Sequence, residues 1–227
     1  EMCIRDRSVS SSSNPGDFYY FDKENMILTF LWDSSPWIDR TKLAKKTPIK
    51  YTARDGLIIH GYLTIPLGTS GKNLPMVVHP HGGPNVRDTM RYDTYVQFLA
   101  SRGYAVFQPN FRGSTGYGAY HYISANKQFG KTMQDDITDG VNYLIDQGVA
   151  DPDRIAIFGG SYGGYATMAG LTFTPDLYAV GINFVGVVDL ELLQEDSNRN
   201  SRRFGGFYDE LRLESVSYTH LTLPTKA

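Results

Sequence analysis

One seven-residue segment constrains the fold of this chain more than any other feature of the sequence. Residues 159–165 read Gly-Gly-Ser-Tyr-Gly-Gly-Tyr and contain the pattern G-x-S-x-G. A short apolar strand pattern precedes the segment, and a helical pattern, Tyr162–Phe173, follows it. A serine on a sharp strand-to-helix turn is typical of a nucleophile elbow, in which the strained backbone excludes bulky neighbours. The segment therefore predicts Ser161 as a nucleophile, with Gly159 and Gly163 making room for the turn.

The chain around this segment alternates strand and helix patterns. Strand patterns occur at Ile49–Arg54, Leu57–Ile65, Pro75–His79, Tyr104–Gln108, Arg154–Phe158 and Ala179–Val185. Helical spacing of apolar residues occurs at Arg91–Ser101 and Thr132–Gln147. This alternation predicts a mainly parallel, doubly wound sheet with helices on both faces. Together with the serine turn, it indicates an α/β-hydrolase fold.

A second glycine-rich loop, His79-Pro80-His81-Gly82-Gly83-Pro84, follows a strand pattern. Acyl transfer creates a negatively charged oxygen, which backbone N–H groups stabilise. Gly83 lacks a side chain and can bring its N–H close, and Tyr162, the residue after the serine, supplies the second N–H of this oxyanion hole. A plain turn with hydrogen-bonded histidines is the alternative. A metal site at His79 and His81 is disfavoured, because no third ligand stands nearby in the sequence.

Two further segments are open to more than one interpretation. Phe107–Gly118 turns through three glycines and is either an active-site loop at the carboxyl end of the sheet or a structural turn. It lacks the lysine of a phosphate-binding loop, so nucleotide binding fits poorly. Asp135, Asp136 and Asp139 stand near the start of a helical pattern, where acidic residues favour the helix dipole. We interpret these three residues as structural.

No complete catalytic triad can be assembled from the sequence. In this fold the acid and then the histidine follow the serine along the chain. Asp189 is a candidate acid, and the only later histidine is His220. The remaining histidines precede the serine; they are His60, His79, His81 and His121. Without a histidine, Ser161 has no general base and is a weak nucleophile.

Both ends of the chain follow from one DNA sequence read on opposite strands. Glu1–Arg7 back-translates as GAGATGTGTATAAGAGACAGA, and the reverse complement of this sequence encodes Ser215–Leu221. We therefore expect residues 1 to about 13 and 215–227 to be adapter-derived additions that pack little against the remainder. His220 drops out of the candidate site for this reason.

Composition limits the partners of the chain. The net charge is −2, with basic and acidic residues interspersed, which gives no electrostatic case for nucleic acid or an anionic membrane. No apolar run approaches the roughly 20 residues of a membrane helix.

The only cysteine, Cys3, lies in the suspected addition, so neither a disulfide nor thiolate catalysis is expected. No cofactor is indicated. The localisation stays open, with the cytoplasm favoured.

Four segments together resemble successive motifs of the prolyl-oligopeptidase family. They are HPHGGP (79–84), QPNFRGSTGYG (108–118), MQDDITDG (133–140) and DPDRIAIFGGSYGGYAT (151–167). The resemblance extends over Pro48–Arg203 and is strongest to the acylaminoacyl-peptidase branch. It implies a serine peptidase that hydrolyses oligopeptides through an acyl-enzyme on Ser161, with Gly83 and Tyr162 in the oxyanion hole.

The resemblance also implies a division of the chain. Residues 14–47 are similar to the end of an N-terminal β-propeller and its linker, and residues 48–214 to an α/β-hydrolase domain that is truncated at its C-terminal end. The catalytic Asp and His of the family lie beyond this chain, so we expect the chain itself to be inactive. A carboxylic-ester hydrolase on the same fold and a non-catalytic fragment remain as alternatives. The oligomeric state and the side-chain preference stay open.

Overall fold

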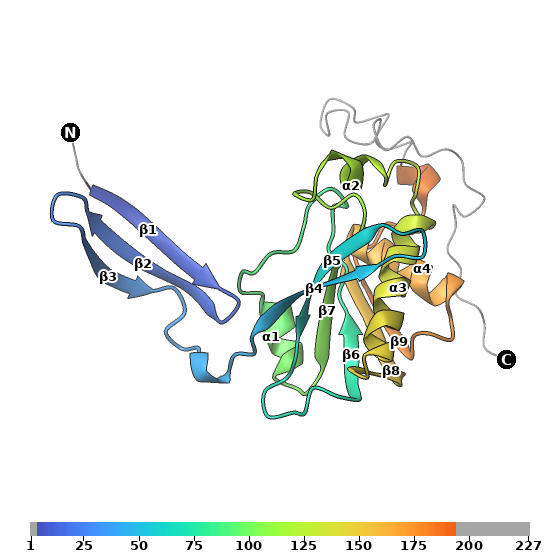
Figure 1. Cartoon of the computed structure of the whole chain (residues 1–227), viewed down its shortest axis with the longest axis horizontal. Coiled ribbons are helices and arrows are strands. Elements are labelled where there is room, and N and C mark those ends of the chain that lie inside the picture. The colour runs from blue at the N-terminus through green and yellow to red at the C-terminus, as the bar shows by residue number, and fades with distance from the viewer. Residues whose placement is uncertain (1–3, 194–227) are drawn as a thin grey trace.

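The computed structural model of the chain describes residues 4–193, which form two sheets of different size (Figure 1). The larger sheet has six strands in the order β4-β5-β7-β6-β8-β9, and the smaller sheet has three strands in the order β1-β2-β3. The suspected addition at 215–227, His220 included, lies outside the described residues.

The larger sheet is mixed but mainly parallel. Its strands are β4 (Lys46–Thr52), β5 (Ile58–Thr64), β6 (Leu74–Val78), β7 (Ala105–Asn110), β8 (Ala150–Gly160) and β9 (Val180–Phe184). Strands β7, β6, β8 and β9 run parallel, whereas β4 and β5 pair antiparallel at one edge. All six residues of β7 are buried, as expected for a strand that is covered on both faces. This architecture confirms the expected α/β-hydrolase fold.

Helices cover both faces of the larger sheet. They are α1 (Thr94–Ala100), α2 (Ala119–Ile123), α3 (Thr132–Asp146) and α4 (Tyr162–Phe173), with a short 3-10 turn, η1, at Arg40–Lys42. On β7, Phe107 packs against Gly140 of α3, whereas the neighbouring Gln108 contacts Asp93, the N-cap of α1. Because adjacent strand residues point to opposite faces, α3 and α1 lie on opposite sides of the sheet. Within residues 4–193, no helix combines the length and the apolar character that crossing a membrane requires.

The smaller sheet lies beside the larger one and consists of β1 (Ile4–Ser11), β2 (Asn14–Asp22) and β3 (Ile27–Asp33) (Figure 1). Cross-strand aromatic pairs stabilise the β2–β3 hairpin: Phe18 stacks on Trp32 with ring centroids 4.7 Å apart, and Tyr19 meets Phe30 edge-on at 5.6 Å. Arg40 joins the two strands through ion pairs with Asp17 of β2 and Asp33 of β3.

The expectation that residues 1–13 pack little fits the side chains of residues 7–11, which are exposed, but not the backbone of β1. This strand pairs with β2 from Ile4, opposite Asp22, to Ser11, opposite Asn14. Ser12 is buried, and its carbonyl oxygen accepts a hydrogen bond of 2.9 Å from the side chain of Gln97. The physical reason is that an open strand edge pairs with an extended segment through backbone groups, whatever the side chains. The pairing concerns packing alone, and the adapter origin of the segment stays a hypothesis.

Candidate active site

Ser161 lies between the end of β8 and the first residue of α4, at the carboxyl end of the parallel strands. Its backbone has φ 56° and ψ −120°, a conformation that residues other than glycine rarely adopt. Its N–H donates to the carbonyl oxygen of Phe184 in β9 at 3.0 Å, and its own carbonyl oxygen accepts from the N–H of Tyr165 at 3.0 Å. These two bonds hold the turn from both sides, and the Ser161 side chain is exposed.

The glycines around Ser161 are required by close backbone contacts. A Cβ atom on Gly159 would overlap with the backbone of Gly163, in the first turn of α4. A Cβ atom on Gly163 would overlap with the carbonyl oxygen of Pro80, and one on Gly164 would overlap with Gly186. The first turn of α4 therefore packs directly on β8 and on the 79–84 loop, which no larger residue would permit.

The predicted oxyanion loop runs next to Ser161. A Cβ atom on Gly82 would lie 3.4 Å from the Cβ of Ser161 and 3.2 Å from the carbonyl oxygen of Gly160. Gly83 has φ 115°, which favours glycine, and it lines the same small pocket as Ser161 and Tyr162. The loop and the serine are thus adjacent. The convergence of the Gly83 and Tyr162 N–H groups on one point stays a prediction.

His81 fastens this loop to the segment that follows β7. Its ring stacks on Phe111 with centroids 4.4 Å apart, and its Nε2 lies 2.8 Å from the hydroxyl oxygen of Ser114. Its Nδ1 lies 2.7 Å from the carbonyl oxygen of Gly82, which can only accept a hydrogen bond. Burial lowers the pKa of His81 to about 4, so the ring is neutral near pH 7. The hydroxyl of Ser114 also lies 2.7 Å from the carbonyl oxygen of Phe111, to which it donates, so the single proton of the neutral ring serves either the Gly82 carbonyl oxygen through Nδ1 or the Ser114 hydroxyl oxygen through Nε2.

The other described histidines also have contacts away from Ser161. His79 stacks on Phe158 and bonds its carbonyl oxygen through Nδ1 at 2.7 Å. The ring of His60 stacks on Tyr117 at 4.8 Å, and Nε2 of His121 lies 3.1 Å from the carbonyl oxygen of Phe111. No histidine of residues 4–193 bonds the Ser161 side chain. In the same part of the chain, no group of three or more His, Cys, Asp or Glu side chains could hold a metal ion.

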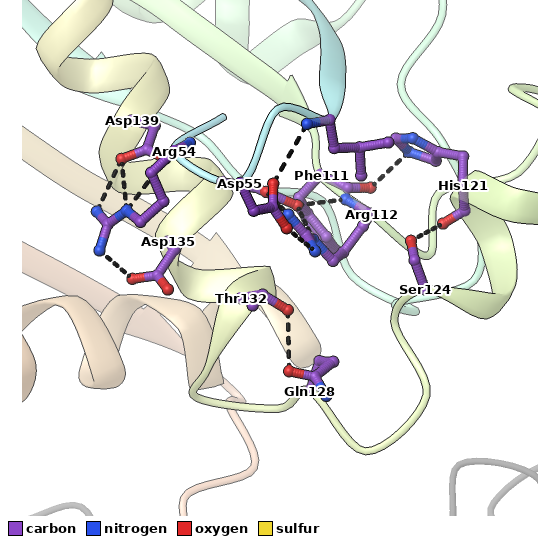
Figure 2. Close-up of polar contacts among 12 residues, drawn as sticks. Arg54, Asp55, Phe111, Arg112, His121, Ser124, Gln128, Thr132, Asp135 and Asp139 are labelled. Carbon is purple, nitrogen blue, oxygen red and sulfur yellow. Dashed lines mark hydrogen bonds and ion pairs between the residues drawn. The ribbon is translucent and has the colours of Figure 1, made fainter. Parts of the chain in front are cut away.

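A buried ion pair between Arg112 and Asp136 anchors the 107–118 segment to α3, and Figure 2 shows Arg112 with its second partner, Asp55. Arg112 contacts Asp136 through Nη2 at 2.7 Å and Nε at 2.8 Å, and its backbone N–H bonds the same carboxylate at 2.9 Å. Its Nη1 reaches Asp55 at 2.7 Å. Burial raises the pKa of Asp136, and the hydrogen bonds from Arg112 oppose that rise. These contacts give the segment a structural role, while the bond between Ser114 and His81 connects it to the candidate site.

The acidic residues at the start of α3 all bind arginines. Arg54 pairs with Asp135 at 2.8 Å and with Asp139 at 2.7 Å, as Figure 2 shows, and Asp136 pairs with Arg112. These ion pairs support the structural interpretation of the three aspartates.

An apolar pocket opens beside Ser161. Its lining consists of Gly83, Pro84, Phe129, Ser161, Tyr162, Tyr165, Val187, Leu190 and Leu193. Phe129 was not predicted from the sequence; its ring meets the Tyr162 ring edge-on at 4.8 Å. Phe129 lies in an irregular connection between α2 and α3, where no periodicity could mark it. Asp189, the candidate acid, accepts a hydrogen bond of 2.9 Å from the N–H of Leu192.

Comparison with known proteins gives consistent matches across this region. The sequence model of the prolyl oligopeptidase family matches residues 90–217. Dipeptidyl aminopeptidase BIII of Pseudoxanthomonas mexicana is 40% identical over 193 residues, which are 82% of this chain and 28% of that protein. The acylamino-acid-releasing enzyme of Arabidopsis thaliana is 31% identical over 130 residues, which are 53% of this chain and 17% of that protein.

Solved structures of similar fold include a puromycin hydrolase, with a TM-score of 0.80 and 26% identity over 94% of this chain and 33% of that one. An acylaminoacyl peptidase solved in complex with Z-Gly-Gly-Phe-chloromethyl ketone has a TM-score of 0.70 and 29% identity, covering 82% of this chain and 30% of that one. The chain thus spans about a third or less of the length of these relatives.

Proposed function

Because the chain belongs to the prolyl oligopeptidase family, we propose that it is the part of a serine peptidase that carries the nucleophile Ser161. The observation that carries this proposal is the backbone of Ser161. A positive φ of 56° at an exposed serine, between a buried strand and a helix, is strain that a purely structural turn would not need.

We propose an acyl-enzyme route at this serine. The Oγ of Ser161 attacks the carbonyl carbon of the scissile peptide bond, and its proton passes to a general base. The C–N bond then breaks, the amine leaves with a proton, and water hydrolyses the ester that remains on Ser161. The backbone N–H groups of Gly83 and Tyr162, together with the N-terminus of α4, stabilise the negative oxygen of the intermediate.

The general base of this proposal comes from outside residues 4–193. The histidines at 60, 79, 81 and 121 contact groups other than the Ser161 hydroxyl, and burial lowers the pKa of His81, whose ring stacks on Phe111. This agrees with the family resemblance, which places the catalytic Asp and His further along the chain. Asp189 caps the turn that follows it and stays the one described candidate for the acid.

The proposed substrate is an oligopeptide with an apolar side chain next to the scissile bond. Every side chain that lines the pocket beside Ser161 is uncharged, and the rings of Phe129, Tyr162 and Tyr165 surround it. Among the relatives, an acylaminoacyl peptidase was solved with a peptide chloromethyl ketone that ends in Phe. The pocket has a volume of only about 20 Å³, so a substrate side chain enters it only when the lining residues move apart, and an apolar side chain then gains free energy by leaving water.

Peptide hydrolysis by protein expressed from the complete gene tests the proposal. We expect cleavage of a blocked peptide anilide with Phe beside the scissile bond to exceed cleavage of its Asp counterpart. Ser161→Ala should reduce the rate by several powers of ten, since the nucleophile acts only as part of the catalytic unit. Ser70→Ala, at an exposed loop serine, is the matched control and should retain full activity. Equal activity of the two variants would rule out Ser161.

A further inference from the structure

The loop that contains Gly83 continues to α1 through Asp88, whose backbone is fixed to the end of β7. The N–H of Asp88 donates to Oδ1 of Asn110 at 2.8 Å, and Nδ2 of Asn110 donates to the carbonyl oxygen of Asp88 at 3.2 Å. The side-chain amide of Asn110 thus binds both backbone groups of one residue. Asp88 is therefore one of the points at which the loop is attached to β7.

The side chain of Asp88 also contacts Gln108 of β7. If Asp88 were ionised, this contact would leave two buried oxygen atoms without a hydrogen bond. Nε2 of Gln108 donates to Oδ1 of Asp88 at 3.0 Å and lies 3.4 Å from Oδ2 of Asp93. The other oxygen of each partner, Oδ2 of Asp88 and Oε1 of Gln108, is buried and has no hydrogen-bond partner in the described part of the chain. Both atoms are acceptors when Asp88 is ionised, and buried acceptors are rarely left unpaired.

We propose that Asp88 is a protonated carboxylic acid that donates its Oδ2 proton to Oε1 of Gln108, and that this two-point acid–amide pair fastens the oxyanion loop to β7. One proton satisfies both of the unpartnered oxygens. Turning the Gln108 amide over does not, because Oε1 would then face the carboxylates of both Asp88 and Asp93. In this arrangement Asp88 is a positioning residue, acting on Gly83 through the loop.

The charges around Asp88 agree with the protonated form. Burial raises the pKa of Asp88 to about 7; the positive charge of Lys46 opposes the rise and the carboxylate of Asp93 adds to it. Lys46, from β4, is itself buried and donates to the carbonyl oxygen of Thr89 at 3.0 Å. No ion pair between Lys46 and Asp88 is present in the described residues.

The polar groups of the other packed segments give Asp88 no further proton. From β5, Tyr62 presents its ring to Nζ of Lys46, 5.5 Å from the centroid. From the loop after β7, the hydroxyl of Tyr117 accepts from Nδ2 of Asn110 at 2.8 Å, and Arg87 lies over the Tyr117 ring, 6.0 Å from its centroid.

The proposal fixes the sign of the pH dependence. The carboxyl has its ordinary pKa of 3.8 when the chain unfolds and about 7 when it is folded. The folded state therefore binds the extra proton between these values, and stability falls as pH rises through this window. Asp88→Asn replaces the acid by an amide, whose N–H₂ donates to Oε1 of Gln108 at every pH. This variant should lose the pH dependence that Asp88 contributes, and comparison at each pH cancels the effects of other groups.

Urea unfolding of the 227-residue chain at pH 5, 7 and 9 tests the stability. Relative to Asp88→Asn, the unfolding constant of the unmodified chain should rise at least about tenfold between pH 5 and 9, because each unit of pKa shift corresponds to a factor of ten. Asp153→Asn, at an exposed carboxylate, is the matched control and should follow the unmodified chain. If the unfolding constants of Asp88→Asn and of the unmodified chain changed by the same factor between pH 5, 7 and 9, the proposal would be overturned.

Infrared spectroscopy tests the proton directly and does not depend on stability. At pH 6 the unmodified chain should show the carbonyl band of a protonated carboxylic acid, which Asp88→Asn lacks and Asp153→Asn keeps. If Asp88→Asn fails to fold, the unmodified chain can be labelled with ¹³C-aspartate. The carboxyl ¹³C signals should then show one aspartate whose carboxyl group is still protonated at pH 6. Full ionisation of every aspartate at that pH would contradict the proposal. Neither measurement involves catalysis, so their failure would leave the proposed role of Ser161 standing.

Discussion

The space for a single Cβ atom determines which positions around Ser161 must be glycine. The turn at Ser161 brings the backbone of Gly163 into contact with Gly159, and a hydrogen atom is the largest substituent that Gly159 can carry. The neighbouring Gly160 is different, because a Cβ atom there would meet Phe184 at 3.5 Å, an ordinary contact distance. Of these two adjacent glycines, only Gly159 is required by a close backbone contact.

Substitution of these two glycines by alanine tests this difference. Gly159→Ala should destabilise the chain by about 2 kcal/mol or more, because a backbone must shift to relieve the overlap. Gly160→Ala should change the free energy of unfolding by less than about 1 kcal/mol, since its methyl group meets Phe184 at an ordinary contact distance. Urea unfolding followed by circular dichroism gives both values, and equal losses would show that the close approach at Gly159 does not exist in solution.

Segments between the regular elements are held by ion pairs of two kinds. Arg112 and Asp136 are both buried, and together they connect the end of β7 to α3. Arg54 and Asp139 connect the β4–β5 turn to the same helix, but Arg54 is exposed. Water screens the second pair and hardly reaches the first.

Removal of one partner from each pair should separate the two cases. Asp136→Asn leaves Arg112 buried without its main counter-charge, and we expect a loss of about 3 kcal/mol or more in the free energy of unfolding. Asp139→Asn should cost about 1 kcal/mol or less, because exposed pairs contribute little. Both values come from urea unfolding at pH 7, and a larger loss in Asp139→Asn would reverse our ranking of the two anchors.

At the level of elements, periodicity in the sequence predicted most strands and helices, including β8, α4 and the apolar face of α3. It did not predict α2, because the five residues of Ala119–Ile123 are too few to show a helical period. It also gave no strand for β1, which pairs through its backbone. The placement of β6 between β7 and β8, and of Phe129 beside Ser161, depends on long-range packing that local patterns do not encode.

At the level of the whole molecule, the described residues contain the proposed nucleophile and its surroundings but no general base that contacts it. They hold a strained serine, a glycine loop beside it and an apolar pocket, whereas the histidines among them contact other groups. The sequence predicted the serine and the loop from their motifs, and it also predicted that no upstream histidine acts as the base. The fastening of the loop by His81 and Asp88 was not foreseen, because both contacts join residues about 20 or more positions apart.

Labelling with a fluorophosphonate probe, followed by mass spectrometry of the labelled peptide, tests the central claim most directly. In protein expressed from the complete gene, we predict a label on Ser161 that Ser161→Ala abolishes and Ser70→Ala retains. The 227-residue chain should label far more slowly, since its described histidines are engaged elsewhere, and His220→Ala should not slow it further. A label on another serine, or equal labelling of the complete protein and its Ser161→Ala variant, would contradict the account.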